Sequence, residues 1–139
     1  MADRAKRAAE LLAEDPYAES LGIRLVDVTD ETITVEMDVT ETHHNFAGST
    51  HGGALFSLAD CAFSLASNVP GGLAVAIDTH LAITAATKAG DTLQAVVHEI
   101  TRGRTLATYR VAVHRTQDDR ICGTFTGTVY VMPTGASGA

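Results

Sequence analysis

Residues 52–68 read GGALFSLADCAFSLASN, and this stretch decides how the rest of the chain must fold. Its apolar residues recur at steps of three and four, the spacing of one packed face of an α-helix. A narrow polar line follows the same steps, and the stretch contains no Lys, Arg or Glu. A surface helix carries more charge, so we predict a helix wrapped by other elements. The apolar face comprises Leu55, Leu58, Ala59, Ala62, Leu65 and Ala66, and the polar line comprises Ser57, Asp60, Ser64 and Ser67.

The segments on either side of this helix carry strand patterns. Ile33, Val35, Met37 and Val39 alternate with polar residues, a period of two that is typical of a half-buried strand. The short separators between the last four strands predict that those strands are antiparallel neighbours. The order helix, two strands, long helix, four strands predicts one α+β domain over residues 1–139, with an antiparallel sheet around the helix. The predicted ranges are a helix at about 2–15, strands at 23–28, 32–39, 73–83, 91–101, 104–116 and 120–131, a loop at 42–50, and a disordered tail from about 133.

Composition narrows the class of protein. Ten Lys and Arg stand against 17 Asp and Glu, a net charge of −7, which disfavours a nucleic-acid partner. Two cysteines are too few for a disulfide framework, and no secretory segment opens the sequence, so we expect a reduced, cytoplasmic setting. The apolar run 52–77 contains Asp60 and is broken at 70–72, so we expect no membrane span. Residues 101–139 hold five Arg and two Asp, which could bind an anionic ligand or be solvated charges on strand edges.

The loop before the long helix and its first turns hold the candidate chemistry. Gly52 and Gly53 open the helix, where unpaired N–H groups carry a partial positive charge and glycine lets a ligand oxygen approach. The alternative is a simple glycine turn. Asp60 sits two turns into an apolar helix, where a carboxylate needs a partner or a function. It is either a base or nucleophile, or an acceptor of strand backbone hydrogen bonds. Asn45 could orient water, or only shape the turn.

Other familiar sites are absent from the sequence. There is no GxSxG, GxxxxGK[ST] or HExxH motif. His43, His44, His51 and Asp60 lack the helical spacing that favours metal binding, so we expect no metal site.

The pattern N-x5-HGG-x6-D, formed by Asn45, 51–53 and Asp60, resembles the hotdog-fold acyl-CoA thioesterases, in the phenylacetic acid degradation (PaaI-type) branch. The resemblance covers about residues 17–131. It differs at 82–87, where many relatives carry proline and arginine, and at Ala76, where some carry serine. Further matching segments are Leu55–Asp60, Ala62-Phe63, Asn68, Gly90–Leu93, Gly103–Thr105 and Phe125–Thr128.

The resemblance implies a site shared between two chains. It implies a homodimer with active sites at its interface, which pairs again into a homotetramer. Gly53 N–H would polarise the thioester carbonyl, and Asp60 of the partner subunit would be the base or nucleophile. His51 and Asn45 would help place thioester and water.

The resemblance also implies where the substrate binds. The phosphates of CoA would meet Lys88, Arg102 and Arg104, beside Thr105. Phe56 and Phe63 are expected to line the pocket for the acyl group.

The expected function is hydrolysis of a small aryl-CoA or a short- to medium-chain acyl-CoA to free acid and CoA, without a cofactor, metal, nucleic acid or membrane. Two alternatives stay open. One is a hotdog hydratase or dehydratase acting on acyl thioesters. The other is a non-catalytic module that binds acyl-CoA in the same groove.

Overall fold

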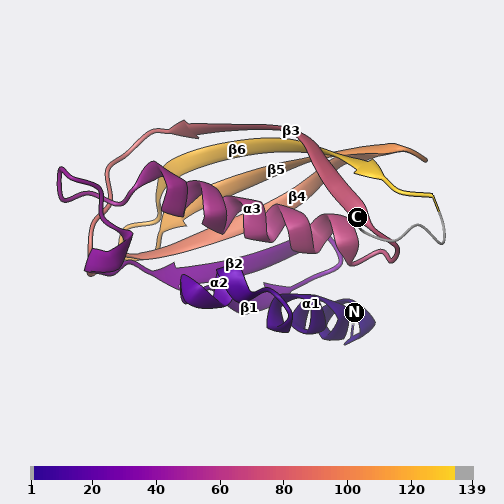
Figure 1. Ribbon diagram of the computed structural model, residues 1–139, viewed down its shortest axis with the longest axis horizontal. Coiled ribbons are helices and arrows are strands. Elements are labelled where there is room, and N and C mark those ends of the chain that lie inside the picture. Colours follow the sequence, from indigo (N-terminus) through magenta and orange to yellow (C-terminus); the bar gives the residue numbers. More distant parts are fainter. Residues whose placement is uncertain (1, 134–139) are drawn as a thin grey trace.

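The computed structural model describes residues 2–133 of the 139-residue chain. One long helix lies along the concave side of a single curved sheet, as predicted (Figure 1). Most of the predicted tail, residues 134–139, lies outside the described residues. The elements are α1 (Ala2–Ala13), α2 (Pro16–Ser20), β1 (Arg24–Val28), β2 (Thr32–Asp38), the 3-10 helix η1 (Glu41–His43), α3 (Gly52–Asn68), β3 (Ala74–Ile83), β4 (Thr92–Arg102), β5 (Leu106–Arg115) and β6 (Arg120–Val131).

The six strands form one antiparallel sheet in the order β1-β2-β4-β5-β6-β3. The neighbours β4, β5 and β6 agree with the prediction, but β3 and β4 do not pair. Instead β3 pairs with β6 at the sheet edge, and β4 pairs with β2 and β5. The eight residues 84–91 form a crossing rather than a hairpin. An extended segment of that length reaches about 25 Å, more than the roughly 14 Å across three strand spacings.

An aromatic cluster fixes α3 on the sheet. The ring of Phe63 lies 5.7 Å from that of Tyr109 on β5 and 5.4 Å from that of Phe125 on β6. A Cβ atom on Gly127 would come within 2.8 Å of the Phe63 ring, so only glycine leaves room for it. Because cores tolerate little change in shape, this fit sets how far α3 lies from the sheet.

The N-terminal helix α1 ends at Ala13, slightly before the predicted boundary, because a second helix begins directly afterwards. Asp15 caps α2 by accepting a hydrogen bond from Ala18 N–H at 3.0 Å. Pro16 then occupies the first turn of α2, where its missing N–H would have had no helical partner. Within residues 2–133, none of the helices has the length and apolar character needed to cross a membrane.

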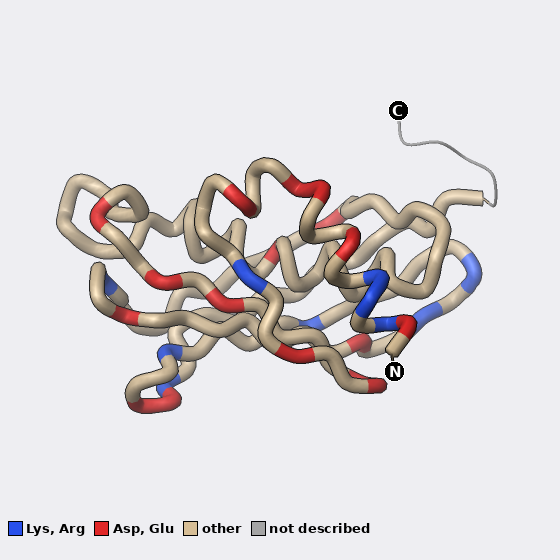
Figure 2. The backbone as a smooth tube through the Cα atoms, turned by 90° about the horizontal axis from the view of Figure 1, so that it is seen from below, with Lys and Arg blue, Asp and Glu red and all other residues tan. Residues whose placement is uncertain are grey.

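Charged residues of both signs occur along the whole backbone. Figure 2 shows several Lys and Arg positions close together at the end of the molecule near the N-terminus, whereas Asp and Glu positions are spread over the rest. Several cations elsewhere have acidic partners: Arg24 pairs with Glu36 and Asp38, and Arg115 pairs with Asp118 at 2.7 Å.

Candidate active site

The helix α3 begins at a histidine cap. His51 is the N-cap residue, with extended backbone angles (φ −61°, ψ 137°), and its Nδ1 accepts a hydrogen bond from Gly53 N–H at 2.8 Å. The ring lies against Gly53, since a Cβ there would be 3.0 Å from Nδ1. The sequence led us to expect a free Gly53 N–H. In this structure the His51 ring occupies that donor, so a carbonyl oxygen must displace the ring to use it.

Asn45 shapes the loop before α3. Its Oδ1 accepts hydrogen bonds from Ala47 N–H at 2.9 Å and from Ser49 N–H at 3.1 Å. This is the turn chemistry that asparagine commonly supplies. The side-chain NH2 group of Asn45 has no acceptor among residues 2–133 and so stays available to a ligand. The structure thus confirms the turn interpretation and leaves one donor for substrate.

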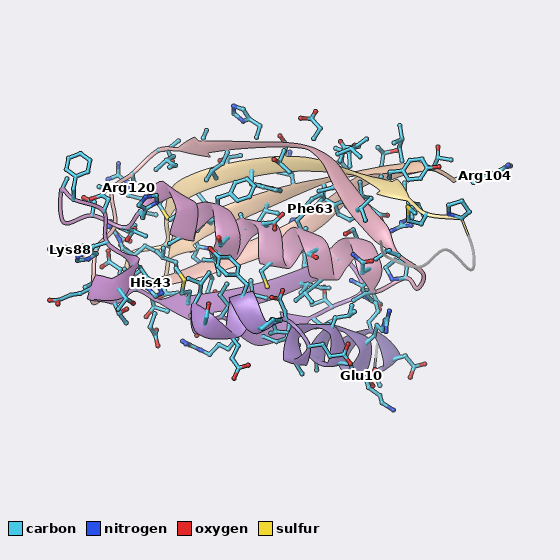
Figure 3. The ribbon with its side chains drawn as sticks, in the orientation of Figure 1. Glu10, His43, Phe63, Lys88, Arg104 and Arg120 are labelled. Carbon is cyan, nitrogen blue, oxygen red and sulfur yellow. The ribbon has the colours of Figure 1, made fainter. Side chains whose placement is uncertain are left out.

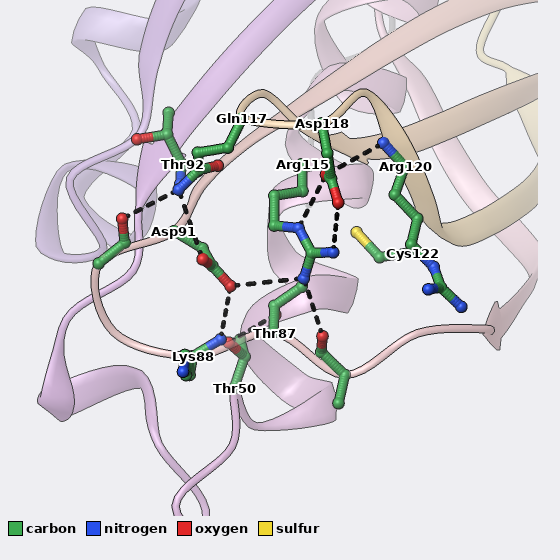
Figure 4. Close-up of polar contacts among 12 residues, drawn as sticks. Thr50, Thr87, Lys88, Asp91, Thr92, Arg115, Gln117, Asp118, Arg120 and Cys122 are labelled. Carbon is green, nitrogen blue, oxygen red and sulfur yellow. Dashed lines mark hydrogen bonds and ion pairs between the residues drawn. The ribbon is translucent and has the colours of Figure 1, made fainter.

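A cavity of about 390 Å³ opens beside the start of α3. One wall is the loop at 45–50, and the other is the crossing segment at 83–87. The two walls are joined by Thr50 N–H donating to Thr87 O at 2.8 Å and Thr87 Oγ1 donating to Thr50 Oγ1 at 2.7 Å (Figure 4). The apolar part of the cavity lining suits an uncharged acyl group. It comprises Leu55, Ile83, Ala85 and Ala86.

Asp60 lies at a second, smaller hollow of about 260 Å³, together with Ser64, Ser67 and Val75. Its carboxylate is half-buried and forms no hydrogen bond within the described residues, so the expected alternative of a strand-bonded aspartate is not what the structure shows. Burial, with a smaller effect from the nearby carboxylate of Asp15, raises the pKa of Asp60 above its usual value. A half-buried carboxylate without a partner is available for proton transfer or nucleophilic attack.

Gly53 and Asp60, the two groups expected to act on the thioester carbonyl, are far apart within one chain. Asp60 comes seven positions after Gly53 on α3, which is about 10 Å along the helix axis. A thioester carbonyl needs its donor and its attacking group each within roughly 3–3.5 Å. One chain therefore cannot supply both groups to one carbonyl.

The predicted phosphate ligands do not come together either. Figure 3 places Lys88 and Arg104 at opposite ends of the molecule. Arg104 and Thr105 are exposed on the β4–β5 turn.

Arg102 is exposed, but its guanidinium already has protein partners. It forms an ion pair with Glu99 at 3.0 Å and donates to the Tyr109 hydroxyl at 3.0 Å. It also donates to the carbonyl of Ser67 at 3.1 Å, in the last turn of α3. These contacts cap the helix and tie it to the sheet. Arg102 therefore has a structural role in this chain, and its binding of phosphate stays a prediction.

The two predicted pocket phenylalanines occupy different settings. Phe63 is buried in the aromatic cluster and reaches only the floor of the hollow at Asp60. Phe56 is partly exposed and packs edge-on against Phe125, with ring centroids 5.6 Å apart. Neither is among the residues that line the cavity at the start of α3.

Several residues that shape this region could not be identified from the sequence. Thr50 and Thr87 resemble ordinary loop threonines, and the sequence pattern suggests a role for His44 only as a possible metal ligand. In the structure His44 Nε2 accepts a hydrogen bond from Ala89 N–H at 2.9 Å. No group of three His, Cys, Asp or Glu residues in the described range is arranged to hold a metal ion.

Comparisons with known proteins agree with this architecture. The family model described as "Domain of unknown function (DUF4442)" matches residues 4–131. A Deinococcus radiodurans protein is 42% identical over 113 residues, which are 81% of this chain and 77% of the relative. The acyl-coenzyme A thioesterase PaaI of Escherichia coli is 36% identical over 132 residues, covering 88% of this chain and 94% of that protein.

Solved structures show the same fold. The structure of E. coli PaaI superposes with a TM-score of 0.90 and 30% identity, covering 94% of each chain. A Streptococcus mutans protein bound to acetyl CoA superposes with a TM-score of 0.75 and 27% identity, covering 79% of this chain and 88% of the other. The chain therefore belongs to the hotdog-fold thioesterases, in the PaaI-type branch of that family.

Proposed function

We propose that this thioester hydrolase acts on acyl-CoA, and that each active site combines the start of α3 from one protomer with Asp60 of the partner subunit. The separation of Gly53 and Asp60 on α3 carries the proposal, since it is too great for one chain to complete a site. A second copy with its α3 antiparallel to the first brings the two ends of the helices together. The relatives named for acyl-CoA thioesterase activity or bound to acetyl CoA support the substrate class.

The edge strand β3 supports pairing between copies. It has no neighbour on its outer side in the sheet order, and several of its apolar side chains are exposed, including Val75 and Ile77. An unpaired apolar edge favours addition of another strand. Pairing β3 with β3 of a second copy would form a homodimer with one continuous sheet, and dimers would pair again into a homotetramer.

The thioester carbonyl oxygen would take the place of His51 Nδ1 as acceptor of Gly53 N–H. At the positive end of α3 this hydrogen bond strengthens as negative charge develops on the oxygen. The displaced imidazole of His51 and the free NH2 group of Asn45 would then contact the thioester or water. The cavity between loop and crossing segment would hold a small aryl or a short- to medium-chain acyl group.

Asp60 would supply the chemical step as base or nucleophile. As a base, its carboxylate takes a proton from water while the water oxygen bonds to the carbonyl carbon and the C–S bond breaks. As a nucleophile, its oxygen bonds to that carbon, CoA leaves as the thiolate, and water cleaves the resulting anhydride. Both routes give acid and CoA without a cofactor. Single turnover in labelled water distinguishes them, because only the second puts solvent oxygen into Asp60.

The phosphates of CoA would be bound by Lys88 of one protomer and Arg104 with Thr105 of the other. Lys88 and Arg104 lie at opposite ends of a protomer (Figure 3), so an antiparallel pair of copies brings unlike ends together. Arg102, the third predicted phosphate ligand, would have to leave Glu99 and the carbonyl of Ser67 to join this phosphate site.

The test is thiol release from phenylacetyl-, benzoyl- and aliphatic CoA esters by the wild type and by Asp60→Asn. The variant should bind CoA esters while kcat falls by roughly 10²–10⁴, the range for losing a positioned base. Burial raises the pKa of Asp60, so its ionised form costs folding stability above that pKa. Asn removes this cost, so the variant should be at least as stable at pH 7, with the gain disappearing below about pH 4. Near-native turnover in a destabilised variant would refute the assignment, and hydration of an enoyl-CoA without hydrolysis would indicate a hydratase.

A further inference from the structure

The two walls of the cavity at the start of α3 are joined at a third point, beyond the two threonine contacts. Ala89 N–H, in the crossing segment, donates to His44 Nε2 in the loop at 2.9 Å. The backbone of His44 is itself fixed, because His44 N–H donates to Glu41 O at 3.1 Å and His44 pairs with Thr50 as an isolated β-bridge. The imidazole therefore links a fixed loop to a segment that belongs to no strand.

We propose that His44 is a positioning residue that sets the width of the acyl cavity by holding the crossing segment 84–91 against the loop. The proposal rests on the proposed function in one respect, namely that this cavity receives the acyl group. The segment forms one wall of the cavity from Thr84 to Thr87, together with Ile83 at the end of β3. Releasing its far end at Ala89 lets that wall move away from α3, which enlarges the cavity and weakens its discrimination between acyl groups.

The contact exists only while the imidazole is neutral. Nε2 accepts the Ala89 N–H, so the single ring proton of His44 is on Nδ1. Protonation of the ring would place an Nε2–H against the Ala89 N–H, two donors facing each other.

The charged groups on the segments that contact His44 are Glu41 on η1 and Lys88 and Asp91 in the crossing segment. Asp91 is already engaged, since it accepts Lys88 N–H at 3.0 Å and lies 3.9 Å from the Arg115 guanidinium (Figure 4). Within the described residues neither Glu41 nor Asp91 pairs with the imidazole. His43 is a second buried ring in the region, and its Nδ1 accepts Thr40 N–H at 3.0 Å.

The first measurement is hydrogen exchange of the Ala89 amide at a single pH. Two variants are compared with the wild type. In His44→Gln the amide oxygen reaches the position of Nε2 and accepts the Ala89 N–H, whereas His44→Leu keeps bulk without an acceptor. We expect the protection of Ala89 to be about fivefold lower in His44→Leu than in the wild type, the size of one net hydrogen bond. His44→Gln should keep the wild-type protection. Because His43 is intact in both variants, a difference between them belongs to position 44.

The second measurement is kcat/KM for CoA esters of increasing acyl length. At pH 8, His44→Leu should lose about tenfold in its preference between the best acyl group and one longer by two methylenes, a discrimination of the size that pocket walls supply. His44→Gln should keep the wild-type preference. His98→Gln, at an exposed position on β4, is the matched control and should behave as the wild type.

The outcomes separate this inference from the proposed function. Wild-type protection of Ala89 in His44→Leu, or an unchanged acyl preference in a variant that still hydrolyses acyl-CoA, would overturn the role of His44 and leave the thioesterase assignment intact. If the wild type hydrolyses no acyl-CoA, the proposed function fails, and the acyl preference assigned to His44 fails with it. The exchange measurement still decides whether His44 holds the crossing segment.

Discussion

Hybrid dimers test whether one active site takes its parts from two chains. One chain carries Asp60→Asn, which removes the carboxylate. The other carries Gly53→Pro, which removes the N–H at the start of α3. Proline is tolerated in the first turn of a helix because those N–H groups have no helical acceptor. The two chains are given different tags, co-expressed, and purified as the dimer that carries both tags.

The expected magnitude follows from the geometry of α3. Gly53 and Asp60 are about 10 Å apart along its axis, so each site of a symmetric dimer pairs Gly53 of one chain with Asp60 of the other. The hybrid then has one site with both changes and one site with neither. It should show about half of the wild-type kcat per dimer. Each parent homodimer should lose roughly 10²-fold or more, the cost of losing an oxyanion donor or a positioned base.

The assay is thiol release from the best CoA ester, and the matched control is a hybrid of the double variant with the wild type. In that control every shared site contains one damaged part, so it should be nearly inactive. If each chain held a complete site, the results would be reversed. The first hybrid would be inactive and the control would keep about half of the activity. That reversal would refute the shared-site reasoning.

Three further predictions follow from the same structure. Arg102→Ala should lower the free energy of unfolding by about 1–3 kcal/mol in urea unfolding, because three hydrogen-bonded groups lose a partly exposed charged donor. Arg104→Ala should raise KM for CoA esters in steady-state kinetics without changing the melting temperature. The opposite pattern would place the phosphate site at Arg102. Burial, and to a smaller extent the charge of Asp15, raise the pKa of Asp60. Asp15→Asn keeps the helix cap and removes only that charge, so the acidic limb of the kcat/KM profile should move slightly to lower pH, and a limb that moves to higher pH would contradict the assignment to Asp60. Phe63→Ala should cost about 3–5 kcal/mol of stability, measured by urea unfolding, because it empties the centre of the aromatic cluster, whereas a loss below about 1 kcal/mol would contradict its place in the core.

The sequence alone was enough to predict the two longer helices, the six strands and most of their boundaries, but not the short helices α2 and η1. The three-and-four spacing in 52–68 predicted a buried helix, and the structure has α3 at Gly52–Asn68. Alternation predicted the strands, since period two places one face of a strand on the core whatever its neighbours are. The resemblance carried by Asn45, 51–53 and Asp60 also identified the family, which the comparisons confirmed.

The pairing of the strands could not be predicted from the sequence in the same way. Local pattern says that 73–83 and 91–101 are strands but not which strands they pair with. The seven residues between them can close a hairpin or cross an open end of the sheet. Here the crossing is fixed by hydrogen bonds to residues far away in the sequence, such as Thr50 to Thr87 and His44 to Ala89. Such pairings leave no local pattern to be found.

The contacts of each candidate side chain could be read only from the tertiary structure. Arg102 and Arg104 look alike in the sequence and are both exposed, yet only Arg102 donates a hydrogen bond to the end of α3. The sequence indicates that Gly53 N–H is a hydrogen-bond donor, but it does not show that His51 Nδ1 accepts this hydrogen bond. These roles depend on which partners lie within hydrogen-bonding distance. That distance is set by packing between elements and not by the neighbours of a residue along the chain.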